Sequence, residues 1–290
     1  MFFGSIPALV TPFAAGRVDE AAFRVLIDWQ IDEGSSALVP CGTTGEVATL
    51  DTQEHHRLIE IAVETARGRV PVIAGCGSYS TAASIAHVQA AEAAGAAAAL
   101  VVVPYYNKPS QAGIAAHFRA IADASDLPII VYNVPGRTVA DISVETLAEV
   151  AKIPSVVGVK DATGNLARVT AQRLACGEGF CQLSGNDDMA LGFNAMGGVG
   201  CISVTANVAP RLCADFQAAM REGRWDDALE LQDRLFPLHL AMFADASPGP
   251  AKYALSKRCG FSPELRLPLT EPSPAAKAAV DAALEHARLA

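Results

Sequence analysis

The chain has 290 residues, of which 51% are apolar and 18% are charged. This composition supplies a core for one large domain or two small ones, and it excludes a mainly disordered chain. Lys and Arg number 22 against 31 Asp and Glu, giving a net charge of −9. Nucleic acid is therefore not an expected partner, because a phosphate-backbone binder would need a basic face within that acidic excess.

Eight short segments rich in β-branched residues predict strands, and each is followed by a longer segment of helical period. The expected strands are Ile6–Val10, Ala37–Cys41, Val70–Ala74, Ala98–Val103, Ile129–Asn133, Val156–Lys160, Cys181–Ser184 and Gly200–Ser203. The expected helices that follow them are Glu20–Glu33, Gln53–Arg67, Thr81–Ala94, Gln111–Ala124, Val144–Lys152, Leu166–Ala175, Asp187–Met196 and Pro210–Glu222. Alternation of this kind predicts a parallel sheet with crossover helices.

Eight strand–helix units favour an α/β protein with a closed TIM (β/α)8 barrel, because an open sheet would leave exposed edges and more often has fewer strands. A doubly wound sheet is the alternative. No strand is followed by G-x-G-x-x-G or by G-x-x-x-x-G-K-[ST], so the phosphate-binding turns typical of that fold are missing.

From Arg224 onward the period stays helical, over Trp225–Ala244, Pro250–Cys259 and Pro274–Leu289. The sequence therefore predicts a catalytic barrel over residues 1–223 and a C-terminal helical region over residues 224–290.

The N-terminal residues 1–13 have no basic region and soon contain proline and polar residues, so we expect no signal peptide and a mature chain that starts here. The longest apolar stretch, Ala93–Val103, is shorter than the roughly 20 residues that a membrane-spanning helix needs. We expect a cytoplasmic protein with no membrane partner. Seven scattered cysteines without a C-x-x-C motif favour buried thiols over a disulfide framework or a zinc knuckle.

Histidine offers one possible metal motif, the adjacent pair His55 and His56. Consecutive residues of a helix point about 100° apart, and no H-E-x-x-H motif or second histidine cluster accompanies them in the sequence. We therefore expect no catalytic metal.

Catalytic groups of a (β/α)8 barrel lie at the carboxyl ends of its strands, and three expected strands end in reactive residues. The second strand leads into Gly42-Thr43-Thr44-Gly45-Glu46, whose backbone N–H groups could converge on a small anion, although Gly and Thr are also ordinary turn formers. The fifth strand ends at Tyr132, which can relay a proton, and Arg137 follows on the loop, where it can hold a carboxylate.

Lys160 ends the sixth expected strand and is the only one of six lysines in such a position. Desolvation disfavours the ammonium form, so an amine there can become a nucleophile toward a carbonyl. The alternative is a structural lysine that reaches solvent or pairs with Asp161. The spacing alone favours neither interpretation.

Together these segments resemble the pyruvate-dependent class I aldolases, the family typified by dihydrodipicolinate synthase, over nearly the whole chain. The matching motifs are Gly42-Thr43-Thr44-Gly45-Glu46, Pro104-Tyr105-Tyr106-Asn107, Tyr132-Asn133-Val134-Pro135-Gly136-Arg137-Thr138, Gly158-Val159-Lys160-Asp161-Ala162-Thr163-Gly164-Asn165, Leu183-Ser184-Gly185-Asn186-Asp187 and Gly200-Cys201-Ile202-Ser203-Val204-Thr205-Ala206-Asn207. Six motifs in the same order make the resemblance highly specific.

The resemblance implies a catalytic role for four residues. Lys160 matches the lysine that forms a Schiff base with pyruvate. Tyr132 matches the proton relay, which is linked through Thr43 to Tyr106, and in this family Tyr106 reaches in from a neighbouring subunit.

Four further residues match substrate-binding positions of the family. Thr44, with the backbone of Thr43, resembles the pocket for the pyruvate carboxylate, and Arg137 resembles the group that holds the carboxylate of aspartate semialdehyde. Gly185 and Ile202 match positions that line the site through their backbone atoms.

The activity implied is condensation of pyruvate with L-aspartate 4-semialdehyde to 4-hydroxy-tetrahydrodipicolinate, in diaminopimelate and lysine biosynthesis, without a cofactor and in a homotetramer of two tight dimers. Another pyruvate aldolase or lyase is the alternative within the family, and Arg137 argues against it, because lyases acting on sialic acid and sugar acids usually lack that arginine. A barrel that only binds small acids is the alternative outside enzymes, and the presence of all four catalytic matches argues against it.

The resemblance fails at one set of positions. Lysine-inhibited relatives bind lysine at the tight-dimer interface with a Ser, two His, an Asn and a Glu, together with a Tyr. In the same order, these positions are occupied here by Val47, Thr52, His55, Tyr79, Ala83 and Tyr105. Only one of the two histidines and the tyrosine are therefore retained. We therefore expect little or no inhibition by L-lysine, since the missing Glu leaves its ammonium group without a partner.

Overall fold

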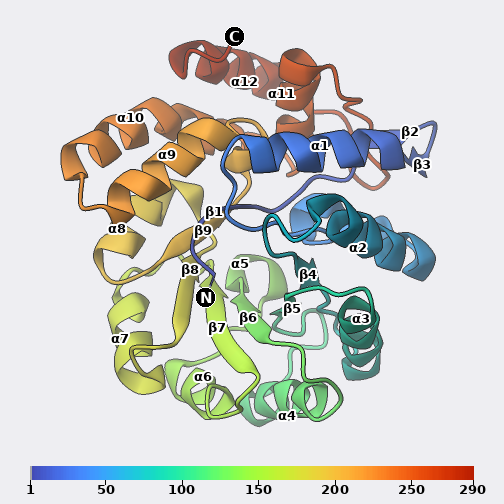
Figure 1. The fold of residues 1–290 in the computed structure, drawn as a ribbon, viewed down its shortest axis with the longest axis vertical. Coiled ribbons are helices and arrows are strands. Elements are labelled where there is room, and N and C mark those ends of the chain that lie inside the picture. Colours follow the sequence, from blue (N-terminus) through green and yellow to red (C-terminus); the bar gives the residue numbers. More distant parts are fainter. Residues whose placement is uncertain (1) are drawn as a thin grey trace.

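Seven strands of the described chain assemble into one parallel sheet, in the order β1-β9-β8-β7-β6-β5-β4 (Figure 1). The computed structural model describes residues 2–290. The strands of this sheet are β1 Gly4–Pro7, β4 Ile73–Gly75, β5 Ala98–Val102, β6 Ile129–Asn133, β7 Val156–Asp161, β8 Cys181–Ser184 and β9 Gly200–Ser203. Seven of the eight expected strands are thus present as strands, most with shifts of one to three residues at their ends.

The eighth expected strand, Ala37–Cys41, is reduced to two parallel bridges. Val39 pairs with Ala8 beyond β1, and Leu38 pairs with Val72 before β4. Pro40 has no N–H to donate, and Cys41 has a left-handed φ of 56°, so a regular ladder cannot continue through this segment. The two bridges still join the ends of the sheet, which closes the barrel and confirms the (β/α)8 architecture over the open doubly wound sheet.

Helices follow the strands and surround the barrel (Figure 1). They are α1 Glu20–Asp32, α2 Thr52–Ala66, α3 Thr81–Ala93, α4 Gln111–Ala122, α6 Val144–Val150, α7 Ala167–Cys176, α8 Ala190–Ala195 and α9 Pro210–Arg221. Side-chain caps define several starts: Ser80, Ser110 and Ser143 each accept a hydrogen bond from a backbone N–H of the first turn, and Asp51 forms a capping box with Glu54.

Short elements occupy several of the connections. They are the antiparallel pair β2 Phe13–Ala14 and β3 Arg17–Val18, the short helix α5 Pro135–Thr138, and the 3-10 turns η1 Thr43–Gly45, η2 Val47–Thr49, η3 Asp187–Met189 and η4 Thr205–Asn207. The expected helix Asp187–Met196 therefore begins as the 3-10 turn η3 before α8.

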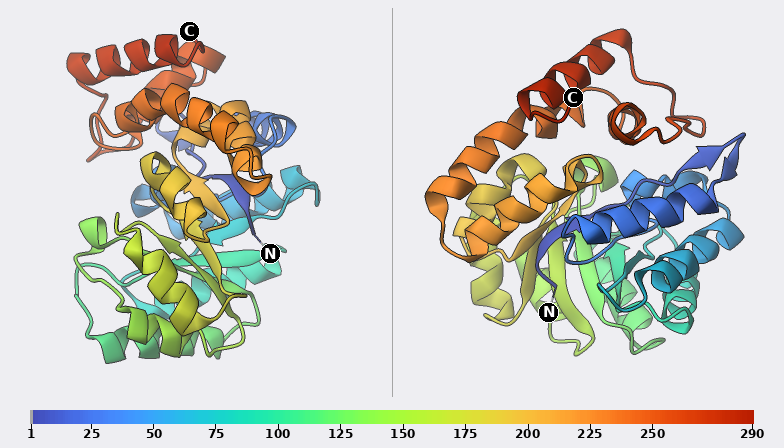
Figure 2. Two further views of the ribbon diagram at one scale, coloured as in Figure 1. Left: turned by 90° about the vertical axis from the view of Figure 1, so that its left-hand side faces the viewer. Right: turned by 45° about the horizontal axis from the view of Figure 1, so that its top comes forward.

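The C-terminal region contains three helices, α10 Trp225–Ala241, α11 Gly249–Cys259 and α12 Pro274–His286. Helix α10 packs against α9 and α12, and α11 packs against α12, so that the three helices form a layer beside the barrel (Figures 1 and 2). A division of the chain after residue 223 stays a prediction. Within residues 2–290, no helix has both the length and the apolar character needed to span a bilayer.

Two apolar clusters hold the fold together. The smaller one fills the barrel interior and includes Ile6, Leu100, Ile130 and Ile202, while the larger one lies between the strands and the surrounding helices. Each fully buried aliphatic side chain contributes roughly 1.5–3 kcal/mol of transfer free energy. Among the cysteines, five are buried, as expected, whereas Cys176 is half-buried and Cys259 is exposed.

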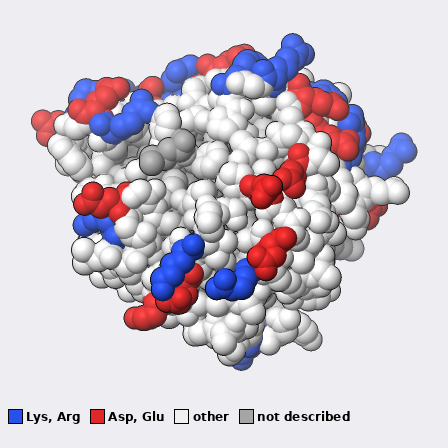
Figure 3. Space-filling view, turned by 60° about the horizontal axis from the view of Figure 1, so that its bottom comes forward, with Lys and Arg blue, Asp and Glu red and all other residues white. Residues whose placement is uncertain are grey.

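The view in Figure 3 shows acidic and basic side chains in small mixed groups, separated by broad uncharged areas. No continuous basic patch lies on that face.

Candidate active site

Lys160 lies inside the barrel at the carboxyl end of β7. Its side chain is only 6% exposed, so the lysine does not reach out to solvent. Lys160 is the register partner of Tyr132 on β6, and its Nζ lies 4.2 Å from the centroid of the Tyr132 ring. The structure therefore brings together the two residues expected to carry the central chemistry.

Asp161 follows Lys160 on the strand and therefore points to the opposite face of the sheet. Its carboxylate is buried and accepts hydrogen bonds from Gln172 Nε2 at 2.7 Å and from Thr163 Oγ1 at 2.6 Å, and Arg168 Nε lies 3.2 Å from it. These groups on and beside α7 neutralise and satisfy the carboxylate. Asp161 is thus not the partner of Lys160, and this lysine neither reaches solvent nor forms the ion pair that the structural interpretation expected.

The segment Gly42 to Glu46 forms a 3-10 turn directly after the bridged segment that closes the barrel. Thr44 is buried and Thr43 is exposed. The first N–H groups of a helical turn have no acceptor within that turn, so Thr43 and Thr44 present backbone donors as well as hydroxyl groups. The Thr11 hydroxyl donates to the carbonyl of Gly45 at 2.7 Å, which ties the turn to the chain after β1.

Glu46 ends this turn in the left-handed conformation, with φ 57°. Its Oε1 lies 2.5 Å from Lys252 Nζ of α11, and its Oε2 accepts the backbone N–H of Arg266 at 3.1 Å. Burial lowers the pKa of Lys252, although Glu46 acts in the opposite direction. Lys252 and Arg266 did not emerge from the sequence as site residues, and Glu46 appeared there only as the last residue of the turn motif. Lys252 and Arg266 each lie more than 200 positions from Glu46, and no local pattern marks these contacts.

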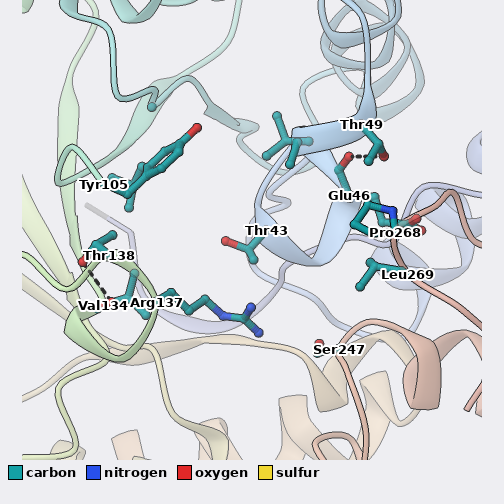
Figure 4. A pocket seen from close by; sticks show the side chains of 14 residues that line it. Thr43, Glu46, Thr49, Tyr105, Val134, Arg137, Thr138, Ser247, Pro268 and Leu269 are labelled. Carbon is teal, nitrogen blue, oxygen red and sulfur yellow. Dashed lines mark hydrogen bonds between the residues drawn. The ribbon is translucent and has the colours of Figure 1, made fainter. Parts of the chain in front are cut away.

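A cavity of about 400 Å³ opens beside this turn, at the carboxyl ends of the strands (Figure 4). Thr43, Arg137 and Tyr105 line it on the barrel side. The C-terminal region contributes Ser247, Pro268 and Leu269. The cavity therefore lies between the barrel and the helical region, which completes its wall.

Lys160 and Tyr132 are not among the residues of the described chain that line this cavity. Val134 does line it, and Val134 belongs to the same interior cluster as Tyr132. The Lys160 amine therefore lies in the barrel interior, not on the surface of this cavity.

Arg137 lies on α5, immediately after β6, and its side chain is exposed. Its guanidinium extends across the cavity in the direction of Thr43 and Ser247 (Figure 4). A carboxylate that enters from solvent would meet this group first, and a guanidinium can bind it through two parallel hydrogen bonds.

The two backbone positions expected to line the site are close to the strand ends. Gly185 follows β8 and donates its N–H to the carbonyl of Asp161 at 2.7 Å. A Cβ at this position would lie 2.7 Å from Cβ of Ala162, so only glycine fits. Ile202 on β9 is 1% exposed and belongs to the barrel interior.

Tyr106 does not join these residues within one chain. It is 89% exposed and has a left-handed φ of 70°, which is uncommon for a bulky aromatic residue. The neighbouring Tyr105 does line the cavity and packs edge-on against Tyr79, with ring centroids 5.5 Å apart.

Within residues 2–290, one group of three possible metal ligands was found, formed by His55, His56 and His87. None of the three lines the cavity. The histidine group is therefore separate from this cavity.

Comparison with known proteins gives a consistent result. The model of the dihydrodipicolinate synthetase family matches residues 1–287. The chain is 65% identical to the 4-hydroxy-tetrahydrodipicolinate synthase of Zymomonas mobilis, with both chains covered completely. Among solved structures, it resembles dihydrodipicolinate synthase from Aquifex aeolicus, with 42% identity, a TM-score of 0.97 and 99% of each chain covered. It also resembles the chloride-inhibited dihydrodipicolinate synthase from Acinetobacter baumannii complexed with pyruvate, with 40% identity, a TM-score of 0.97 and both chains covered completely. The chain therefore belongs to the dihydrodipicolinate synthetase family.

Proposed function

We infer that this chain catalyses the condensation of pyruvate with L-aspartate 4-semialdehyde to 4-hydroxy-tetrahydrodipicolinate, a step of diaminopimelate and lysine biosynthesis, and we propose that Lys160 forms the Schiff base. The observation that carries the proposal is the buried amine of Lys160 beside the Tyr132 ring. The relative from Acinetobacter baumannii was crystallised with pyruvate, which supports a keto acid as the first substrate.

The first half of the reaction makes a carbon nucleophile from pyruvate. The amine of Lys160 attacks the keto carbon. The hydroxyl group formed there takes up a proton and leaves as water, which gives an iminium ion. The iminium draws electrons from the methyl group, so a methyl proton leaves and an enamine forms. We assign the proton transfers to the Tyr132 hydroxyl, since its ring lies over the Lys160 amine.

The second half joins the two substrates. The enamine carbon attacks the aldehyde carbon of the semialdehyde, and the aldehyde oxygen takes a proton. The amino group of the adduct then attacks the former keto carbon and displaces Lys160, which closes the ring and frees the enzyme. Arg137 holds the carboxylate of the semialdehyde at the cavity, where its guanidinium lies.

Other residues bind and orient the first substrate. The Thr44 hydroxyl and the backbone of Thr43 bind the pyruvate carboxylate, and backbone atoms of Gly185 and Ile202 line the site. This assignment rests on the resemblance and on their positions at the carboxyl ends of the strands.

We further propose that the active form contains at least a tight dimer, and that two such dimers form a homotetramer in the cytoplasm. Tyr106 is almost fully exposed on the single chain. A neighbouring subunit would bury this ring and place it near Thr43 and Tyr132 to complete the proton relay.

Trapping with borohydride tests the role of Lys160. Borohydride reduces an imine to a stable amine, so incubation with pyruvate should label the peptide that contains Lys160. Lys160→Arg should abolish the label and the activity, because a guanidinium stays protonated and is not nucleophilic. Lys152→Arg, at an exposed lysine paired with Glu149, is the matched control and should be labelled like the parent. A label on Lys108 or Lys252 would refute the assignment.

The nearest competing function is cleavage of a sugar acid or sialic acid to pyruvate on the same scaffold. Product analysis with both substrate classes separates the two functions. Cleavage of a sugar acid together with no turnover of the semialdehyde would refute the synthase function, while Lys160 would still be trapped.

A further inference from the structure

Three histidine side chains meet between α2 and α3, away from the active-site cavity. His55 and His56 lie on α2, and His87 lies on α3. One ring nitrogen of each lies within 4.8 Å of those of the other two. The ring centroids of His55 and His87 are 4.1 Å apart, and those of His56 and His87 are 5.4 Å apart.

His55 is oriented as metal-binding histidines are. Its Nε2 lies 2.7 Å from the carbonyl oxygen of Gly75, and a carbonyl can only accept, so Nε2 carries the proton. The lone pair of the neutral ring is therefore on Nδ1. This atom is buried and has no hydrogen-bond partner in residues 2–290, and the side chain is only 3% exposed. A ligating histidine usually donates its other N–H to such a carbonyl.

His56 and His87 supply two more nitrogens. Nε2 of His56 and Nδ1 of His87 lie 3.2 Å apart in a hydrogen bond, which an ion bound to both nitrogens replaces. Two ligands of a tetrahedral zinc ion, each at about 2.0 Å, lie about 3.3 Å apart. Both side chains are partly exposed, so an ion and a fourth ligand such as water could enter from solvent.

Two buried thiols adjoin the group without competing as ligands. The thiol of Cys41 donates to the carbonyl of His55, and the thiol of Cys76 donates to that of His87. Both thiols are buried, and each is held by a backbone carbonyl. The remaining ligands are three nitrogens, which suit zinc, nickel, copper or cobalt.

We propose that His55, His56 and His87 form a binding site for a divalent transition-metal ion, with zinc as the best match, distinct from the catalytic site. The ion joins α2 to α3 and leaves one coordination position open. The site takes no part in the condensation, since none of its ligands lines the cavity.

Binding is tested with Co²⁺ and Zn²⁺ on the full-length protein, freed of any affinity tag and pretreated with EDTA. Co²⁺ bound in a tetrahedral nitrogen site gives visible absorption bands, and added Zn²⁺ should remove them by displacement. One ion should bind per chain. Zn²⁺ should also raise the thermal midpoint in a concentration-dependent manner, because it binds the folded state.

The variants are His87→Leu and His56→Leu, with His286→Leu on α12 as the matched control at an exposed histidine outside the group. We expect the first two variants to weaken Zn²⁺ binding by more than about 100-fold. Loss of a residue that only hydrogen-bonds to a metal ligand costs up to about 100-fold, and loss of a ligand itself should cost more. The control should bind Zn²⁺ like the parent. Circular dichroism and thermal unfolding in EDTA establish that each variant is folded. If His87→Leu does not fold, His87→Gln is measured in its place.

Two results would overturn the proposal. One is the absence of a Co²⁺ spectrum in the parent protein. The other is Zn²⁺ binding that is equal in the parent and in folded His87 and His56 variants, which would place the ion elsewhere.

Discussion

The carboxylate of Glu46 and the ammonium group of Lys252 form an ion pair 2.5 Å apart, in which the side chains are 0% and 1% exposed. Nζ of Lys252 also donates to the carbonyl of Glu264 at 2.7 Å and lies 4.2 Å from the centroid of the Phe13 ring. Helix α11 thereby fixes the end of the turn that contains Thr43 and Thr44. The C-terminal region thus positions the turn of the barrel that we propose binds the pyruvate carboxylate.

Lys252→Met should destabilise the protein and impair pyruvate binding. It leaves the Glu46 carboxylate buried without its charged partner, which costs about 3–5 kcal/mol. The free energy of unfolding in urea and the KM for pyruvate measure the two effects. The double variant Glu46→Gln/Lys252→Met should regain much of the stability, because neither charge remains. A single variant as stable as the parent would show that the pair does not hold the turn.

Arg137→Ala should impair use of the semialdehyde while trapping of pyruvate on Lys160 persists. The substitution removes a charge-assisted contact of roughly 1.5–3 kcal/mol, which corresponds to a loss of about 10- to 150-fold in kcat/KM for the semialdehyde. Arg119→Ala, at an exposed arginine of α4, is the control and should behave like the parent. Equal loss of both functions would place Arg137 at the pyruvate site.

Tyr106→Phe and Lys160→Arg should each be nearly inactive alone and should complement each other when mixed. In a mixed dimer, the subunit that retains Lys160 receives an intact Tyr106 from its partner. Random exchange of subunits makes about half of the dimers mixed, each with one working site, so roughly a quarter of the parent activity should return. Co-expression followed by an initial-rate assay measures this. If no activity returns, Tyr106 acts within its own subunit or not at all.

L-lysine should inhibit this enzyme weakly or not at all. The position of the expected Glu is Ala83, so the ammonium group of lysine would lose hydration without gaining a charged partner, a penalty of about 3–5 kcal/mol if it were fully buried. Tyr79 packs against Tyr105, and the Nε2 of His55 is engaged by Gly75. Initial rates at several millimolar lysine provide the test. Half-maximal inhibition below about 1 mM, equivalent to roughly −4 kcal/mol of binding, would contradict the prediction.

The sequence determined the features that depend on local patterns. Alternation of β-branched and helical segments predicted a closed barrel, and the strands β6, β8 and β9 have the predicted bounds. Lys160 was identified because it ends an apolar strand, and strand ends are where a barrel presents its reactive groups. Motif order identified the family. Each of these features depends on residues close together in the chain, so it can be predicted from the sequence without the tertiary structure.

The tertiary structure decided what depends on distant residues. Only the fold shows that Lys160 faces the Tyr132 ring while Asp161 binds to α7 residues, since the face of a strand residue depends on the strand's neighbours. Only the fold brings Lys252 to Glu46, across more than 200 positions, and His87 to the pair on α2. Contacts of this kind arise from packing between separate elements, so the spacing of residues in the sequence does not predict them.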